Sequence, residues 1–212
     1  MSAAIFAALD ALTVPAGGAT RLAAPGGGDR YTTSAAVLAA YYPTPPAGQS
    51  TPLAYVASGA NFPDGLAVGP VAGAQGAPLA LVPGTSVPAV IDAQLRRLRP
   101  PRIVIIGGTA SVSAAVATQL AADLAAGGTV TRWSGADRYA TAAAISRNAF
   151  PGQPALASVY VAAGTNFPDA LSAAPLAARS GVPLLLVPPG SVPAATSTEL
   201  SRLGARSLVI LG

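Results

Sequence analysis

The stretch that decides the fold occurs twice in this chain. Tyr55-Val-Ala-Ser-Gly-Ala-Asn-Phe-Pro-Asp64 returns 105 residues later as Tyr160-Val-Ala-Ala-Gly-Thr-Asn-Phe-Pro-Asp169. Two further segments recur at the same shift: Gly76-Ala-Pro-Leu-Ala-Leu-Val-Pro83 as Gly181-Val-Pro-Leu-Leu-Leu-Val-Pro188, and Ile103-Val-Ile-Ile-Gly107 as Leu208-Val-Ile-Leu-Gly212. Self-similarity at a fixed spacing indicates a tandem repeat, here with a period of about a hundred residues.

Further repeated motifs show where one repeat unit ends and the next begins. Asp29-Arg-Tyr31 matches Asp137-Arg-Tyr139, and Ser2-Ala-Ala-Ile5 resembles Ser113-Ala-Ala-Val116, so the chain begins and ends at the same point of the period. We predict three parts: a terminal helix of a preceding or permuted repeat at 1–14, repeat unit 1 at 15–126, and repeat unit 2, lacking its last helix, at 127–212. In this division, either a third repeat is missing or the first helix closes the last unit.

Short apolar runs alternate with Ala-rich stretches inside each period. The second copy predicts strands at 130–133, 158–162, 183–187 and 208–211, and helices at 138–147, 168–178 and 193–203. The runs are apolar throughout instead of alternating with polar residues, which indicates strands buried on both faces. The sequence therefore predicts an α/β fold of tandem units, each a mostly parallel sheet between helix layers, with right-handed crossovers.

Proline and aspartate residues mark the N-termini of the predicted helices. We expect a proline at the first helical position of four helices, where a missing N–H costs nothing, and an aspartate N-cap on two others. The prolines are Pro63, Pro88, Pro168 and Pro193, and the aspartates are Asp29 and Asp137.

Composition excludes several classes of function. Hydrophobic residues make up 51% of the 212 residues, which is enough to fill a core. Cys and His are absent, so thiolate and imidazole catalysis and the usual zinc ligand sets are excluded. A net charge of +4, with all basic residues arginine, favours an anionic partner, but 9% charged residues provide no dense patch for nucleic acid.

The mean hydropathy of +0.51 is high. However, Pro, Gly or Arg interrupts every apolar run before the roughly 18 to 20 residues that a spanning helix needs, so we expect no transmembrane segment. The start, Met1 to Leu12, carries Asp10 and no basic n-region, so it is expected to be neither a signal nor a transit peptide. If the protein is exported, the signal lies outside this chain.

The repeated Asn-Phe-Pro-Asp motif is one candidate binding element. Asn61 and Asp64, like Asn166 and Asp169, fall between the end of a predicted strand and the start of a helix, where open α/β sheets place ligands. They could present amide and carboxylate groups to sugar hydroxyls or to a cation. In a purely structural interpretation, Asn is a turn or capping residue and Asp interacts with the helix dipole.

The Asp-Arg-Tyr motif is the second candidate. Arg30 with Tyr31, and Arg138 with Tyr139, could grip an anionic, hydroxylated polymer through bidentate bonds and stacking. The structural alternative is an internal ion pair, in which Arg30 holds Asp64 and Arg138 holds Asp169.

Other features point to chemistry less strongly. Gly107-Gly108-Thr109 follows a strand, but neither GxGxxG nor GxxxxGK[ST] is present, so we expect no phosphate cofactor. A catalytic pair of acids would need Asp64 or Asp169 near another acid, which the repeat does not predict. One basic cluster is interpreted as a solvated helix end, or alternatively as a weak polyanion patch: Arg96, Arg97, Arg99 and Arg102.

Taken together, these motifs resemble the cell wall-binding repeat type 2 family. The fuller copy, Gly135 to Gly212, carries Asp137-Arg-Tyr-Ala-Thr-Ala142, Val159-Tyr-Val-Ala-Ala-Gly-Thr-Asn-Phe-Pro-Asp-Ala-Leu-Ser-Ala173, Pro183-Leu-Leu-Leu-Val187 and Val209-Ile-Leu-Gly212, while Pro15 to Leu120 carries a looser copy. The resemblance implies Rossmann-like or Toprim-like modules, usually three in tandem around a pseudo-threefold axis. It also implies a polymer path near the Pro-Leu-Leu-Leu segment.

By this resemblance the chain anchors a bacterial surface protein, without catalysis, to an anionic cell-wall polysaccharide or teichoic-acid-like polymer outside the cell. We expect no cofactor, no metal and no catalytic residue; the expected partners are the polymer and neighbouring repeat units, in pseudo-threefold or homo-oligomeric packing. Two alternatives stay open: a Rossmann-type small-molecule or nucleotide enzyme using Asp64 and Asp169, and a structural surface-layer self-assembly module.

Overall fold

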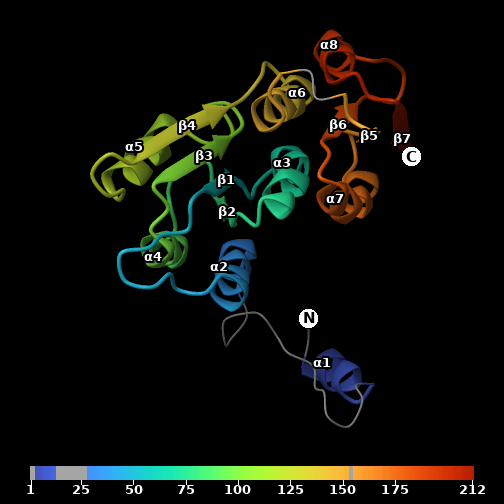
Figure 1. Ribbon diagram of the computed structural model, residues 1–212. Helices are drawn as coiled ribbons and strands as arrows, with labels where there is room; N and C mark the ends of the chain where they lie inside the picture. The colour runs from blue at the N-terminus through green and yellow to red at the C-terminus, as the bar shows by residue number, and fades with distance from the viewer. Residues whose placement is uncertain (1–2, 13–27, 153–154) are drawn as a thin grey trace.

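The computed structural model describes residues 3–12, 28–152 and 155–212, and it contains two parallel sheets with helices on both faces (Figure 1). A first helix, α1 (Ala3–Asp10), precedes them. The first unit runs α2 (Arg30–Tyr41), β1 (Ala54–Ser58), α3 (Pro63–Ala74), β2 (Leu79–Val82), α4 (Ala89–Leu98), β3 (Arg102–Ile106), α5 (Ala114–Ala122) and β4 (Thr129–Trp133). The second runs α6 (Arg138–Ala149), β5 (Ser158–Ala163), α7 (Pro168–Ser180), β6 (Leu184–Val187), α8 (Ala194–Leu203) and β7 (Ser207–Leu211).

The two sheets repeat the same pairing. Their strand orders are β2-β1-β3-β4 and β6-β5-β7, and every pair is parallel. Tyr55 lies opposite Leu79, and the equivalent Tyr160 lies opposite Leu184. The predicted α/β fold with parallel strands is therefore confirmed, and β1, β2 and β3 correspond to β5, β6 and β7. Burial of every strand is not: β1 and most of β3 and β6 are buried, whereas β4 is buried only at Trp133 and the described β7 is exposed except for half-buried Leu211.

Strand β4 links the units. It follows residue 126, where the sequence period places the end of unit 1, yet it pairs with β3, with Trp133 opposite Ile106. The sheet boundary therefore lies one strand beyond the boundary of the sequence period. Helix α1 occupies part of the predicted terminal helix at 1–14, of which residues 1–2 and 13–14 lie outside the described residues.

Each face of the first sheet has its own core. Val56 and Ile105 point into a cluster under α2, α4 and α5. On the opposite face, Tyr55 and Trp133 pack with their ring centroids 5.6 Å apart, in a cluster that also contains residues of α3, α6, α7 and β6. This second cluster, which we call the shared core, joins the two units.

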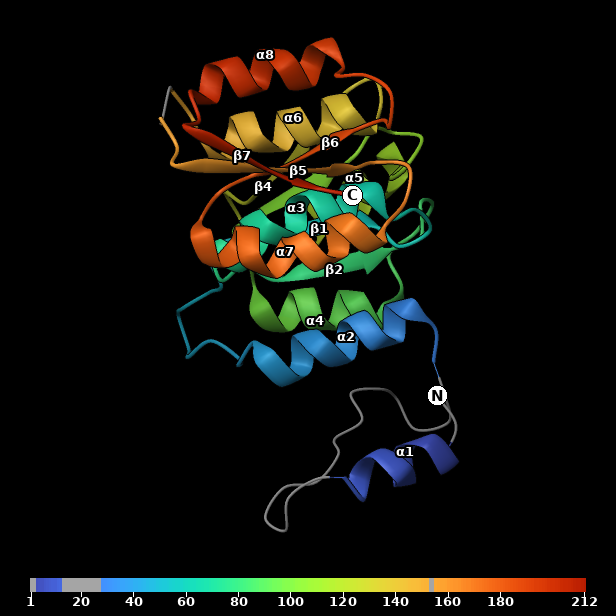
Figure 2. The ribbon, with the colours of Figure 1, turned by 90° about the vertical axis from the view of Figure 1, so that its right-hand side faces the viewer.

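Helices α3 and α7 lie side by side in the middle of the molecule (Figure 2). Near their N-termini the Phe62 and Phe167 rings meet edge to face, with centroids 5.9 Å apart. Near their C-termini, a Cβ added to Gly73 would lie 3.0 Å from Cβ of Ala178. Equivalent helices of the two units therefore run parallel, and their N-termini point the same way.

The helix starts agree with the sequence in all but one respect. Asp29 caps α2 by accepting the N–H groups of Tyr31 and Thr32, and Asp137 caps α6 by accepting that of Ala140. Prolines open α3 and α7 as predicted. In α4 and α8, however, Pro88 and Pro193 are the N-caps, one position before the predicted one. No helix in the described parts of the chain is long and apolar enough to cross a membrane.

Replacing Ile145 of the shared core by Ala should lower the free energy of unfolding by about 2–5 kcal/mol, because a buried side chain is lost and its space is only partly refilled. Both sheets border this core, so a single shifted transition is expected from Trp133 fluorescence and from far-UV circular dichroism in denaturant. Val90→Ala, on the exposed side of α4, is the control and should change stability by about 0.5 kcal/mol or less. Two separate transitions would contradict a shared core.

Candidate binding site between the repeat units

The Asp-Arg-Tyr motif of each unit holds a loop of its own unit. The Arg30 guanidinium donates to the carbonyl of Gly59 at 2.5 Å, and Arg138 donates to that of Gly164 at 2.6 Å. The Tyr31 ring lies so close to Gly59 that an added Cβ would be 2.7 Å from its Cε1, and Tyr139 approaches Gly164 in the same way. These glycines are required because any side chain there would collide with the ring.

This arrangement corrects the predicted internal ion pairs. Within the described ranges, neither Arg30 with Asp64 nor Arg138 with Asp169 forms a salt bridge; each arginine binds the carbonyl at the end of its strand instead. A guanidinium has five donors in a fixed plane, so one bond to a carbonyl leaves donors for other partners. Arg138 in addition stacks over the Phe62 ring of the first unit, 5.8 Å from the centroid.

Asp64 contacts a different part of the structure. It lies in the first turn of α3 and is buried, with its carboxylate directly over Gly107, where an added Cβ would be 2.1 Å from Oδ2. Burial raises the pKa of Asp64, and this effect outweighs the hydrogen bond with Ser111 and the charge of Arg138, which both lower it. Asp64 is thus a carboxylate of one unit within the field of an arginine of the next.

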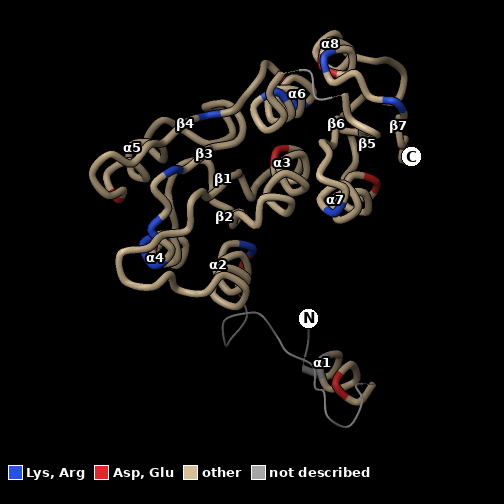
Figure 3. Tube along the Cα trace, in the orientation of Figure 1, with Lys and Arg blue, Asp and Glu red and all other residues tan. Residues whose placement is uncertain are grey.

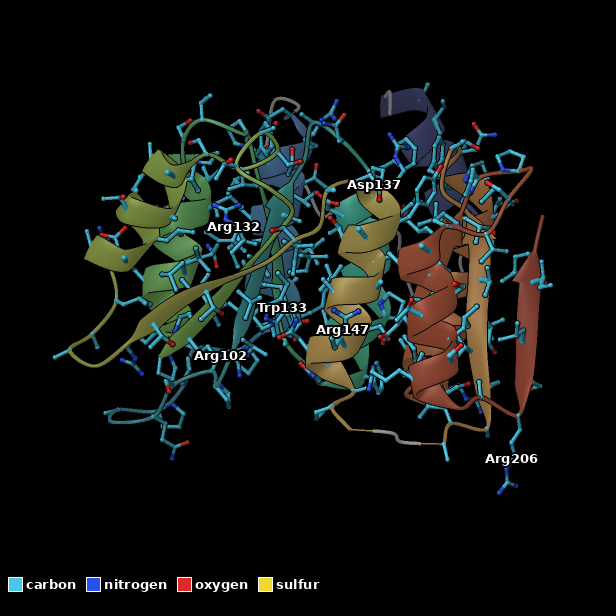
Figure 4. The ribbon with its side chains drawn as sticks, turned by 90° about the horizontal axis from the view of Figure 1, so that it is seen from above. Arg102, Arg132, Trp133, Asp137, Arg147 and Arg206 are labelled. Carbon is cyan, nitrogen blue, oxygen red and sulfur yellow. The ribbon has the colours of Figure 1, made fainter. Side chains whose placement is uncertain are left out.

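A polar pocket of about 240 Å³ lies at this point. It is formed by the N-terminus of α3, the loop after β3, and the loop from β4 to the N-terminus of α6, at which Figure 4 labels Asp137. The lining residues are Asn61, Pro63, Asp64, Gly108, Ala110, Ser111, Gly135, Ala136, Asp137, Arg138 and Thr141. We call it the junction pocket. Small-molecule sites usually measure about 300–1,000 Å³, so the pocket suits one small polar group better than a whole cofactor.

A shallower groove borders the junction pocket. It has a volume of about 450 Å³ on the first unit and includes Arg30, Asn61, Phe62 and Leu66 in its lining. Asn61 lines both hollows. The groove beside Arg30 and the junction pocket beside Arg138 therefore meet at Asn61.

The structure therefore brings Asn61, Asp64 and Arg138 together, with Arg30 in the adjoining groove. The structural interpretation made Asn61 a turn or capping residue; the N-cap of α3 is Phe62, so the capping role does not apply. Asp169 repeats the position of Asp64, because a Cβ added to Gly212 would lie 2.8 Å from its Oδ2, but neither Asn166 nor Asp169 lines the junction pocket.

Sequence reasoning missed Ser111 and Asp137 as pocket residues. Asp137 places a second carboxylate in the pocket of Asp64, which the repeat did not predict. Two signals were available: the Gly107-Gly108 turn after a buried strand, and the position of Asp137 directly before Arg138. The segment Leu184–Leu186, near which the family resemblance places the polymer, is buried in β6, so its side chains do not face solvent.

The arginine cluster of the first unit is used internally. Arg97 donates to the carbonyls of Leu38 and Tyr42, and Arg99 donates to those of Pro45, Pro46 and Gln49. Arg96 bridges Asp92 and Asp123, and Arg102 lies over the Trp133 ring. Figure 3 shows these charges gathered around α4, far from α7. Arg97 and Arg99 fasten the end of α2 and the Pro-rich segment to α4, and Arg96 and Arg102 have other internal partners, so the four are not a free anion patch.

Fold and site together define a class of protein: a tandem-repeat α/β module whose polar pocket is built where one repeat meets the next. Comparison with known families identifies it further. The family described as Cell wall binding domain 2 (CWB2) matches residues 25–117 and 132–212, and the chain belongs to this family. It is a cell wall-binding domain.

Relatives of known sequence and structure agree. The chain is 27% identical over 187 residues to N-acetylmuramoyl-L-alanine amidase LytC of Bacillus subtilis (strain 168), covering 88% of this chain and 35% of LytC. It is 33% identical over 132 residues to the amidase enhancer of the same organism, covering 62% and 18%. Two solved structures superpose with a TM-score of 0.74 at 26% identity, Cwp6 and Cwp8 from Clostridium difficile, covering 89% and 88% of this chain and 28% and 30% of theirs. The chain thus spans about a third of its relatives or less.

The raised pKa of Asp64 predicts a particular pH dependence of stability. The folded protein holds the Asp64 proton more tightly than the unfolded chain, whose carboxyl titrates near 3.8, so the contribution of Asp64 to stability should fall as pH rises through the window above 3.8 and then level off. Urea unfolding of wild type and Asp64→Asn from pH 3.5 to 7 isolates this contribution as their difference. If the stability of the wild type relative to Asp64→Asn instead increased with pH, the burial of this carboxyl would be contradicted.

Proposed function

We propose that the junction pocket and its groove bind an anionic cell-wall polysaccharide or teichoic-acid-like polymer, and that the chain thereby anchors a longer protein to the wall outside the cell. The observation that supports this proposal is the convergence of Asn61 and Asp64 of one repeat with Arg138 of the next. Such a site exists only when two repeats are packed together, which gives the tandem arrangement a function.

The pocket offers two kinds of recognition. Arg138 is a permanent cation that keeps donors beyond its bond to Gly164, and it can pair with a phosphate or carboxylate of the polymer. Asn61, Ser111 and Asp64 offer amide, hydroxyl and carboxylate groups for sugar hydroxyls. A polymer that alternates anionic groups and sugars presents both chemistries at short intervals. Tyr31 and Tyr139 would support this site by packing against the loop glycines Gly59 and Gly164. Asn166 and Asp169 lie outside the junction pocket and would contact the polymer at the equivalent place on the second unit.

Affinity would come from repetition. A pocket of this size makes few contacts, so one junction binds weakly, and several junctions along one polymer add avidity because each later contact is intramolecular. Units 15–126 and 127–212 are the repeats of this proposal, with neighbouring repeat units as further partners. Pseudo-threefold packing of such units is one arrangement and homo-oligomeric packing another.

A catalytic role is less well supported. Asp64 and Asp137 share the pocket, but Asp137 is engaged as the cap of α6 through a 2.7 Å bond from Ala140, and Asp169 is not in that pocket. The amidase named among the relatives shares only 35% of its length with this chain. We therefore propose a non-catalytic anchoring role, with any effector activity elsewhere in the longer protein.

Binding to cell-wall sacculi tests this function. Wild type should be retained on sacculi that carry anionic polymers, released by high salt, and lost when the polymers are stripped. Asn61→Ala and Arg138→Ala should each weaken retention several-fold. Arg206→Ala is the control with the same charge change, because Arg206 is exposed and projects away from the pocket (Figure 4).

Because Arg138 also donates a hydrogen bond to Gly164, the fold of Arg138→Ala is checked by circular dichroism. Asn61→Ala leaves that hydrogen bond in place and therefore provides a second, independent test of the pocket. Equal losses for Arg138→Ala and Arg206→Ala would mean that net charge and not the pocket drives binding. Retention that is independent of the anionic polymers would refute the proposed partner.

A further inference from the structure

Three sources of positive charge meet at the junction pocket. The first turn of α3 and the start of α6 both contribute to its lining, and each helix N-terminus carries about half an elementary charge from its unpaired N–H groups. Arg138 adds a full charge, and it keeps donors beyond its bond to the carbonyl of Gly164. A site of this kind normally binds a phosphate or sulfate.

Two carboxylates in the same pocket offset these charges. Asp137 is the N-cap of α6 and accepts the N–H of Ala140 at 2.7 Å, so its charge is held at that helix end. Asp64 lies in the first turn of α3, but this helix does not depend on it for a cap, because Phe62 is the N-cap and no side chain caps the helix. The carboxylate of Asp64 therefore has a role in the pocket that the start of α3 does not explain.

The turn after β3 fixes the position of Asp64. Its Oδ2 would be 2.1 Å from a Cβ added to Gly107, so only glycine leaves room for the carboxylate. Gly107 has a φ of 96°, a conformation that glycine adopts without strain. Ser111, which follows the same turn, forms a side-chain hydrogen bond with Asp64. Only 7% of Asp64 is exposed, so an anion that entered the pocket would meet a negative charge that water screens poorly.

The other charged groups around Asp64 come from α6 and β4. Arg138 and Asp137 line the pocket from the start of α6, while Arg132 of β4 donates to the carbonyl of Gly107 at 2.7 Å; Figure 4 labels Arg132 and Asp137. Burial is the largest effect on Asp64 and raises its pKa, although a hydrogen bond and the charge of Arg138 lower it. Asp64 therefore loses its charge at a higher pH than an ordinary aspartate.

We propose that Asp64 determines the specificity of the junction pocket by excluding simple anions. While its carboxylate is ionised, the charges of the pocket nearly cancel, and a sulfate or free phosphate would have to give up water beside a buried negative charge. A group that carries a hydroxyl next to its anionic charge can donate the hydroxyl to Asp64 while the charge pairs with Arg138. The pocket therefore selects hydroxylated anions, such as the phosphate of a sugar or polyol.

This selection deepens the proposed function. A polymer whose anionic groups lie beside free hydroxyls is admitted, whereas inorganic phosphate and sulfate, which would otherwise compete for Arg138, are kept out. The assignment of a wall polymer as the source of the hydroxylated anion rests on the proposed function, whereas the selection itself does not.

Two small dianions test the selection without any polymer. Sulfate has no hydroxyl to donate, whereas glycerol phosphate is a hydroxylated dianion at pH 7.5. In chemical-shift titrations by NMR at this pH, the wild type should bind glycerol phosphate more tightly than sulfate. Asp64→Asn should bind sulfate about tenfold more tightly than the wild type, because a buried like charge is removed at nearly constant volume. Asp123→Asn, the same charge change at the end of α5 and outside the junction pocket, should bind sulfate like the wild type.

Acid provides a second route to the same state that needs no variant. As the pH falls from 7.5 to 4.5, protonation of Asp64 should strengthen the binding of sulfate to the wild type, and the affinity should approach that of Asp64→Asn. Asp64→Asn lacks this titration, so its sulfate affinity should change less. Adding Arg138→Ala to Asp64→Asn should abolish the gain in sulfate binding, which would locate the sulfate in the junction pocket.

Three outcomes overturn the inference: equal sulfate affinity of wild type and Asp64→Asn, a gain that survives Arg138→Ala, and a wild type that prefers sulfate to glycerol phosphate. A purely structural role of Asp64 gives the first of these, with a lower free energy of unfolding and no change in the order of the two anions. Retention on sacculi is measured separately. Selection without retention counts against the proposed function alone, and retention without selection counts against this inference alone.

Discussion

The packing of α3 against α7 is the constraint on which the rest of the structure depends. Small residues bring them close: a Cβ added to Gly73 of α3 would lie 3.0 Å from Cβ of Ala178 of α7, and both sheets border the same core. Because the helices are parallel, the N-terminus of α3 is held where the loop after β3 and the start of α6 arrive. The polar pocket is a consequence of apolar packing between units: if α3 moved relative to α6, Asp64 and Arg138 would separate.

The fold could be predicted from the sequence because its signals are local and repeated. Apolar runs, opening prolines and aspartate caps each act within a few residues, and two copies of every signal agreed. The few differences in the fold have local causes: Pro88 and Pro193 cap their helices because their extended backbone, with ψ near 142° and 148°, cannot begin a helical turn. Strand β4 joins the first sheet because pairing follows the exposed edge of β3 and not the period of the sequence.

The site was only half predictable, because its decisive contacts cross between units. The sequence alone placed Asn61 and Asp64 at the end of a strand and Arg138 at the start of a helix. It did not show that the Arg138 motif of the second unit meets the Asn61 and Asp64 motif of the first. Pairing inside a repeat was the simpler hypothesis, yet Arg138 reaches the carbonyl of Gly164 in its own repeat while its charge acts on Asp64 of the other. The role of Ser111 was hidden for a different reason: it belongs to the same unit as Asp64, but no spacing rule links the two residues.

The charges at the pocket also explain why it does not resemble a nucleotide site. The N-terminus of α3 carries a positive partial charge that would attract any phosphate, but Asp64 in the first turn offsets it, and Asp137 does the same at α6. The remaining positive group of the pocket lining is the Arg138 guanidinium, which donates hydrogen bonds in fixed directions, unlike the diffuse positive field of a helix N-terminus. A free phosphate would have to approach two carboxylates to reach it. A polymer can bring an anionic group to Arg138 while its sugar hydroxyls donate to those same carboxylates, so the acids that repel a simple anion favour a hydroxylated one.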